Sequence, residues 1–319
     1  MKRLGRGLIL ALTAMLFPGV SACGTETVPG TSGTSDSEGE TQQSGPETTE
    51  SGGESRLETV QYTITYDGTE YEKEAVVYVP AGYSGDEPLN TLYLMHGSGG
   101  SADQMADTLK PLLDEWMESG EMQSCLVIFP TYYPDRSFVV TDYSRDYPLN
   151  HFFAADELLT LVRTVERQYY TFAADTTDDG LTESRLHRAF GGYSMGGVTT
   201  WEVLAYESPY FAYYMPMAGD CWLGRGTDAS GPETIADSLA AGLTNAGYTA
   251  DDFRVIAMVG GADGTRGSMI PQIEALRSRH GDLFTDESLL YWENEGGGHS
   301  GESMVLEIQH GIRYLWTLS

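Results

Sequence analysis

Short hydrophobic stretches of strand length recur along the sequence, and they alternate with segments whose apolar residues repeat with the period of a helix. Residues 60–66 alternate between apolar and polar side chains, Asp67-Gly68 is typical of a hairpin turn, and residues 75–79 read as the returning strand. Further strands are predicted at Leu92–Met95, Leu126–Phe129, His187–Phe190, Phe211–Met217, Val255–Val259 and Leu289–Trp292. Helical stripes run over residues 158–169 and 305–315.

This alternation predicts an α/β fold with a mostly parallel central sheet and helices on both faces. In such folds, ligands bind in loops at the carboxyl ends of the strands. Candidate functional residues are therefore sought directly after the predicted strands.

The amino-terminal region differs from the rest in composition. Residues 1–22 combine the basic Lys2, Arg3 and Arg6 with the apolar run 8–17, which is typical of a signal peptide and too short to span a bilayer. Residues 20–23 resemble a bacterial lipobox, which implies cleavage before Cys23 and its lipidation; the alternative is a plain signal peptide with an incidental cysteine. The expected location is the extracellular face of the bacterial membrane, held by the lipid anchor alone.

Residues 23–56 are rich in Ser, Thr, Gly and acidic residues and predict a disordered tether. Residues 57–319 then form the single predicted domain. The whole chain carries 47 acidic and 18 basic residues, a formal net charge of −29, which argues against a nucleic-acid partner because phosphates require Lys and Arg. Besides Cys23 there are only Cys125 and Cys221, predicted to be unpaired thiols.

A candidate nucleophile follows the strand at 187–190. Residues 191–197 read Gly-Gly-Tyr-Ser-Met-Gly-Gly and lead into a helical segment, which is the G-x-S-x-G pattern in its strand–turn–helix context. Glycines at 192 and 196 would let strand and helix approach closely. The pattern predicts that Ser194 is a nucleophile; the alternative is an ordinary glycine-rich turn.

A serine hydroxyl needs a base to take its proton. His299 follows the strand at 289–292 in a glycine-rich loop and is the preferred base, whereas His280 and His310 lie in helical segments. Asp263, directly after the strand at 255–259, is the preferred acid, with Asp220 as the alternative.

The loop after the strand at 92–95 reads His96-Gly97-Ser98-Gly99-Gly100. The backbone N–H groups of Ser98 and Met195 are predicted to form an oxyanion hole. His96 precedes the nucleophile and is interpreted as a residue that braces this loop.

With these motifs in place, the segment 92–316 resembles the feruloyl-esterase branch of the α/β-hydrolase carbohydrate esterases. The resemblance is carried by residues 93–97, 188–197, 199–201, 214–222 and 271–275. It implies the α/β-hydrolase fold and a Ser194–Asp263–His299 triad. It also implies that Trp222 forms an aromatic wall that stacks on a phenolic acyl group, and that the substrates are ester-decorated plant polysaccharides or small aryl esters.

The expected activity is therefore serine-dependent hydrolysis of feruloyl esters, without a cofactor or metal. An acetyl or general carboxylesterase, an acyltransferase, and a catalytically inactive glycan-binding lipoprotein are the alternatives. Residues 175–186 hint at a calcium loop, but Thr177 and Leu186 occupy ligand positions. The tyrosines at 132, 133, 143 and 147 either line a groove or pack in the interior.

Overall fold

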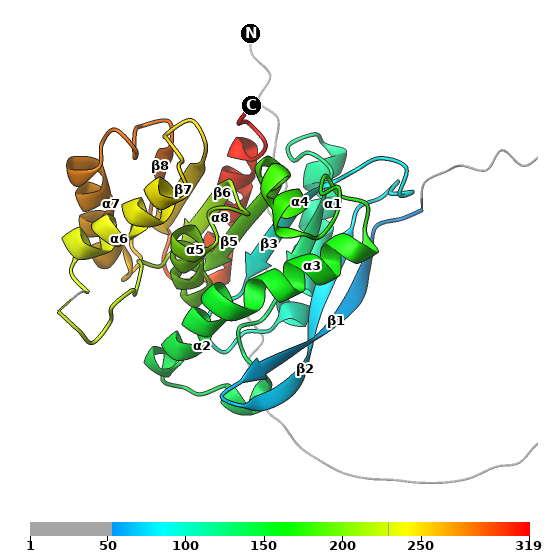
Figure 1. The fold of residues 1–319 in the computed structure, drawn as a ribbon, viewed down its shortest axis with the longest axis horizontal. Helices are drawn as coiled ribbons and strands as arrows, with labels where there is room; N and C mark the ends of the chain where they lie inside the picture. Colours follow the sequence, from blue (N-terminus) through cyan, green and yellow to red (C-terminus); the bar gives the residue numbers. More distant parts are fainter. Residues whose placement is uncertain (1–52, 229) are drawn as a thin grey trace, which may run out of the picture. The chain divides into compact units, whose positions relative to one another are not determined.

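An eight-stranded, mostly parallel β-sheet forms the centre of the protein, in the order β1-β2-β4-β3-β5-β6-β7-β8 (Figure 1). The computed structural model describes residues 53–228 and 230–319. The predicted signal peptide, Cys23 and all of the tether before residue 53 lie outside these ranges. The strands are β1 (Arg56–Tyr66), β2 (Thr69–Val79), β3 (Asn90–Met95), β4 (Cys125–Phe129), β5 (Arg188–Tyr193), β6 (Tyr213–Met217), β7 (Arg254–Gly260) and β8 (Leu289–Asn294).

Helices cover both faces of this sheet. They are α1 (Ala102–Glu118), α2 (Tyr147–Phe152), α3 (Leu158–Gln168), α4 (Asp178–Glu183), α5 (Met195–Tyr206), α6 (Pro232–Asn245), α7 (Arg266–Arg279) and α8 (Gly301–Gly311). In Figure 1, α2, α3 and α5 lie in front of the sheet, with α1 and α8 behind it. No described helix is both long and apolar enough to cross a bilayer.

The order of the strands locates the functional edge. From β3 the chain crosses to β4 on one side, whereas from β5 it proceeds through β6, β7 and β8 on the other. With right-handed crossovers, the connecting helices then lie on opposite faces, and the carboxyl ends of β3 and β5 flank a crevice. The loop beginning at His96 and the Ser194 turn lie at these two ends.

Several predicted boundaries move in the structure, and the returning strand of the first hairpin, predicted at 75–79, begins at Thr69. The strand predicted at 187–190 begins at Arg188 and continues through Gly191 and Gly192 to Tyr193, because a paired strand tolerates glycines that read as a turn in sequence. The strand predicted from Phe211 begins at Tyr213. The last helix ends at Gly311, and Ile312–Tyr314 form a 3-10 turn.

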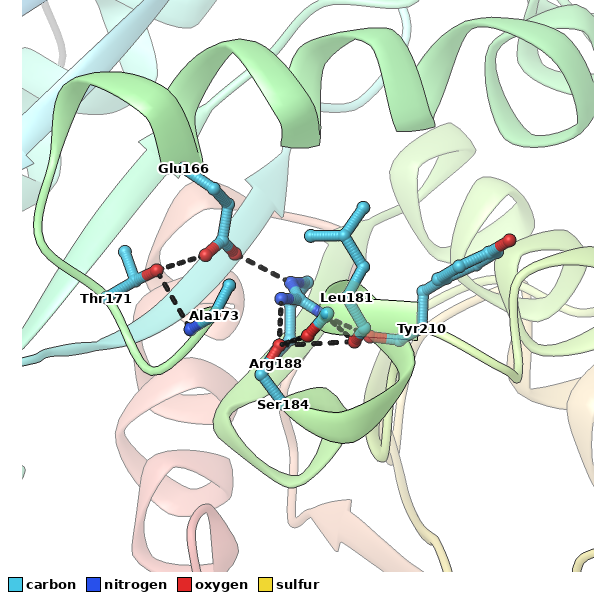
Figure 2. Close-up of polar contacts among 8 residues, drawn as sticks. Glu166, Thr171, Ala173, Leu181, Ser184, Arg188 and Tyr210 are labelled. Carbon is cyan, nitrogen blue, oxygen red and sulfur yellow. Dashed lines mark hydrogen bonds and ion pairs between the residues drawn. The ribbon is translucent and has the colours of Figure 1, made fainter. Parts of the chain in front are cut away.

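The amino end of β5 is held by a buried ion pair (Figure 2). Arg188 Nε donates to Glu166 Oε1 of α3 at 2.8 Å, and both side chains are about 1% exposed. The guanidinium also donates to the hydroxyl of Ser184 and to the carbonyls of Leu181 and Tyr210. A buried charge is tolerated when it is paired and its donors are satisfied. The strand that leads to Ser194 is thus fixed at its start.

Candidate active site

Ser194 lies on the sharp turn between β5 and α5. Its backbone has φ 58° and ψ −117°, a left-handed conformation that costs a non-glycine residue roughly 1–3 kcal/mol. Hydrogen bonds from Ser194 N to Met217 O and from Val198 N to Ser194 O hold the turn. Side chains at the neighbouring glycines would clash, since a Cβ at Gly192 would lie 2.4 Å from Gly196 O and a Cβ at Gly196 would lie 2.4 Å from Met95 O. The glycines expected from the sequence are required by this close approach.

Ser194, His299 and Asp263 form one hydrogen-bonded chain. His299 Nε2 lies 2.9 Å from Ser194 Oγ, and His299 Nδ1 lies 2.8 Å from Asp263 Oδ2. An ionised carboxylate only accepts hydrogen bonds, so Nδ1 carries the proton and Nε2 is free to accept the serine proton. This is the tautomer that a general base needs.

Thr265 orients the carboxylate of Asp263. The Thr265 backbone N–H and its hydroxyl each donate to Asp263 Oδ1 at 2.8 Å, while Oδ2 faces His299. Asp263 is 5% exposed, so its contacts are shielded from water. The loops that carry the acid and the base are joined by a hydrogen bond from Ala262 N to Gly297 O, 2.8 Å long.

The alternative acid, Asp220, lies elsewhere in the site. Its Oδ1 is 3.4 Å from Nε1 of Trp222, and burial raises the pKa of its carboxyl. No hydrogen bond joins it to a histidine among the described residues. The structure thus brings Asp263, not Asp220, to His299.

The predicted oxyanion loop packs directly on the nucleophile. A Cβ placed on Gly97 would lie 3.1 Å from Ser194 Cβ, so the loop touches the serine turn. His96 Nδ1 donates to Gly97 O at 2.7 Å, and its Nε2 is 2.8 Å from Thr131 Oγ1. Burial lowers the pKa of His96 to about 4, so the imidazole is neutral near pH 7. His96 therefore braces the loop, as predicted.

Two cavities meet at the triad. One, of about 900 Å³, lies between the oxyanion loop and the start of α8. The second, of about 630 Å³, lies beside Trp222 and the Asp263 loop. Ser194, His299 and Tyr143 line both. An ester bound with its carbonyl carbon at Ser194 would place its acid and alcohol portions in different cavities.

Trp222 lies in an aromatic cluster at the second cavity. Tyr143 and Tyr147 have ring centres 6.1 and 6.0 Å from its ring, and the Arg225 guanidinium lies 3.3 Å from the ring centre. One ring face is thus covered by a cation, which the sequence did not predict. Arg225 is only three residues away, but its orientation depends on the fold of the loop.

The four tyrosines divide between the two predicted roles. Tyr132 and Tyr133 are buried and bond to Asp146, and the partly buried Tyr147 packs beside Trp222. Tyr143, in contrast, is 56% exposed and lines both cavities. Cys125 and Cys221 are buried free thiols. Within residues 53–228 and 230–319, no three His, Cys, Asp or Glu side chains group as candidate metal ligands.

No protein-family model matches the chain. It is 33% identical over 228 residues to endo-1,4-beta-xylanase Y of Acetivibrio thermocellus. The match covers 70% of this chain but only 20% of the xylanase, so the chain corresponds to a small part of that protein.

Solved structures extend the similarity. A mutant feruloyl esterase module from Clostridium thermocellum, complexed with sinapinate, is 29% identical with a TM-score of 0.68, over 82% of this chain and 89% of that one. A ferulic acid esterase from Anaeromyces mucronatus has 16% identity and a TM-score of 0.60 over 86% and 93%. An S-formylglutathione hydrolase from Staphylococcus aureus has 15% identity and a TM-score of 0.55 over 83% and 98%. The last two show a shared α/β-hydrolase fold.

Proposed function

We propose that this chain, a carboxylic ester hydrolase with the α/β-hydrolase fold and a relative of the feruloyl esterase modules, releases hydroxycinnamoyl groups from plant cell-wall polysaccharide. The observation that carries the proposal is the hydrogen-bonded chain from Ser194 through His299 to Asp263. The 29% identity to a feruloyl esterase module supports the choice of acyl group.

The triad geometry supports a two-step mechanism. Ser194 Oγ attacks the ester carbonyl carbon while its proton passes to His299 Nε2. The bond to the sugar oxygen then breaks, and His299 returns the proton to the departing alcohol. Water attacks the acyl-enzyme with His299 again as base, which releases the free acid and regenerates Ser194. Asp263 keeps His299 in the required tautomer and stabilises its cationic form.

The developing oxyanion needs donors already in place. Met195 is the first residue of α5, and N–H groups in the first turn of a helix have no partner within the helix. We assign the N–H groups of Met195 and Ser98 to the oxyanion, as the sequence predicts. The positive end of the α5 dipole adds to this stabilisation.

The two cavities suggest how the substrate is divided. A phenolic ring in the second cavity would meet the Trp222–Arg225 pair, since both indole rings and guanidinium planes stack on aromatic groups. The larger cavity, open at Ser98, Gln104 and Thr108, would then accept the sugar. These assignments make Trp222 and Arg225 determinants of acyl-group specificity.

The test compares methyl ferulate with p-nitrophenyl acetate for the wild-type protein and for Ser194→Ala. Hydrolysis of both that is lost in Ser194→Ala supports the proposal, with Ser238→Ala as a matched control on the exposed face of α6. Hydrolysis of p-nitrophenyl acetate without hydrolysis of methyl ferulate would favour an acetyl or general carboxylesterase. If the acyl group is transferred to an added alcohol faster than to water, an acyltransferase is favoured. Absence of both activities would favour an inactive glycan-binding protein.

We also propose that the mature protein is tethered to the outer face of the bacterial membrane through a lipid on Cys23. The basic residues before the apolar run at 8–17 and the small residues before Cys23 support this. Metabolic labelling with an alkyne fatty acid should label the wild-type protein but not Cys23→Ser. Labelling of both would contradict it.

A further inference from the structure

The segment between β4 and α2 clamps the oxyanion loop through several independent contacts. Ser98 Oγ donates to Asp146 Oδ2 at 2.5 Å, and Gly99 N donates to the Tyr133 hydroxyl at 2.9 Å. Arg136 Nη1 donates to Gly100 O at 2.6 Å. Each contact joins residues more than 30 positions apart in the chain, so the loop geometry depends on this second segment.

Asp146 is the centre of the clamp. It is fully buried, and its Oδ2 accepts from three hydroxyls: Ser98 at 2.5 Å, Tyr133 at 2.8 Å and Tyr132 at 3.0 Å. No Lys, Arg or His forms an ion pair with it in the described part of the chain. Its second oxygen, Oδ1, is buried without a hydrogen-bond partner among the described residues, and burying a charge without a counter-ion is costly.

The direction of each hydrogen bond is fixed. A carboxylate accepts and a backbone N–H donates. The Tyr133 hydroxyl therefore accepts a hydrogen bond from Gly99 N–H and donates one to Asp146. Ser98 is thereby held by its side chain and by the peptide that follows it. Asp146 is the common acceptor of both links.

The peptide group between Gly97 and Ser98 is held through its carbonyl oxygen. Gly97 O accepts from His96 Nδ1 at 2.7 Å and from Gly100 N at 3.1 Å. In a trans peptide the N–H points opposite to the C=O, so the N–H of Ser98 points away from these donors. Ser98 and Ser194 line the same cavity. Rotation of this peptide would require the contacts of Ser98 with Asp146 to break.

We propose that Asp146 is a positioning residue for the reaction. It fixes Ser98 so that the Ser98 N–H is aimed at the oxyanion before substrate binds. The inference rests on the proposed hydrolase function of the site but not on the identity of the acyl group.

Ser98→Ala tests the link with least disturbance, because it removes the hydroxyl and keeps the backbone N–H. Loss of one oxyanion donor typically lowers kcat about 10²–10³-fold; with the N–H present but no longer fixed, we expect about a 10-fold to 100-fold loss of kcat on p-nitrophenyl acetate, with KM changed less than threefold. Asp146→Asn should act in the same direction. The matched control is Ser137→Ala, which breaks another 2.5 Å Ser–Asp hydrogen bond, to Asp135, on the exposed part of the same segment.

A tetrahedral inhibitor separates positioning from a general loss of structure. The inhibition constant of phenylboronic acid, which forms a tetrahedral adduct with an active-site serine, should rise in Ser98→Ala by the same factor as kcat/KM falls. The inhibition constant of the planar product, acetate, should stay within twofold. If Asp146→Asn does not fold, Ser98→Ala still decides.

Activity and boronate affinity of Ser98→Ala within twofold of Ser137→Ala would overturn the inference. A wild-type protein that hydrolyses p-nitrophenyl acetate but not methyl ferulate would instead overturn the proposed substrate. The role of Asp146 would then still be decided by the Ser98→Ala comparison.

Discussion

Asp263→Asn tests the role of the triad most sharply, because the structure fixes how the new amide must lie. Asp263 Oδ1 accepts two hydrogen bonds from Thr265, each 2.8 Å long. An asparagine that placed its NH₂ group there would face the backbone N–H of Thr265, which can only donate, and would lose that bond at roughly 1–3 kcal/mol for a buried group. The amide oxygen will therefore stay at Thr265, and the NH₂ group will face His299.

This orientation reverses the histidine tautomer. His299 Nδ1, 2.8 Å from the former Oδ2, must then accept a hydrogen bond, and the ring proton moves to Nε2. Nε2 lies 2.9 Å from Ser194 Oγ and can no longer take the serine proton. The equivalent change in a Ser-His-Asp protease lowers kcat about 10⁴-fold, which corresponds to about 5.5 kcal/mol in the activation barrier.

The assay is kcat on p-nitrophenyl acetate near pH 7, with thermal unfolding as a check on the fold. Asp220→Asn is the matched control and should stay within about threefold of wild type, because Asp220 bonds to Trp222 and not to His299. Adding Thr265→Ala to Asp263→Asn keeps the backbone N–H that orients the amide, so the double variant should stay as inactive as Asp263→Asn. Retention of more than a tenth of wild-type kcat in Asp263→Asn, or inactivation by Asp220→Asn, would refute the tautomer mechanism.

Three further changes have expected outcomes. Trp222→Ala should raise KM for methyl ferulate about 10-fold, because a lost aromatic contact is worth about 1.4 kcal/mol, while kcat/KM for p-nitrophenyl acetate changes little. Glu166→Gln should lower the free energy of unfolding by about 3 kcal/mol, since the buried Arg188 loses its counter-charge. Burial and the nearby Asp263 raise the pKa of Glu307 from 4.5 to about 8, so the folded state holds an extra proton between these values. The free energy of unfolding should therefore fall as pH rises from 4.5 to 8, by up to about 5 kcal/mol from this group, and Glu307→Gln should remove that part of the slope.

Each of these outcomes has a matched comparison. Trp222→Phe should preserve ferulate binding better than Trp222→Ala; equal losses would exclude stacking. Asp237→Asn breaks an exposed pair with Arg279 and should change the free energy of unfolding little, because solvent screens exposed charges. A loss as large as that of Glu166→Gln would contradict the explanation from burial. Burial also raises the pKa of Glu207 to about 8, so part of the pH slope should persist in Glu307→Gln. Urea unfolding at pH 5 and pH 8 gives the change in the free energy of unfolding with pH for the wild-type protein and for Glu307→Gln. An equal change in the two proteins would show that Glu307 is ionised in the folded protein.

Much of the fold could be predicted because it follows from local patterns. Each apolar run between helical segments became a strand, since buried parallel strands need continuous apolar residues. The candidate triad could be located because its members follow three such strands. The boundary at Gly191-Gly192 was misread, because a glycine pair has the same appearance in a turn and in a strand that must approach a helix closely.

The contacts that shape the site could not be read from the sequence. Asp146 lies 48 residues from Ser98, and nothing in the local composition around it distinguishes it from the other acidic residues nearby. The stacking of Arg225 on Trp222 depends on a loop without periodicity. Motifs identify the reacting groups, whereas the residues that orient them depend on tertiary packing.

The clamped loop has a consequence for the range of substrates. An enzyme whose oxyanion donors are ordered only by substrate binding must spend part of the binding energy on that ordering, which penalises small esters that offer few contacts. Here the loop is already held by Asp146, Tyr133 and Arg136. The turnover of an ester should then depend little on how much of the polysaccharide remains attached, and short feruloylated fragments should be processed nearly as fast as long ones.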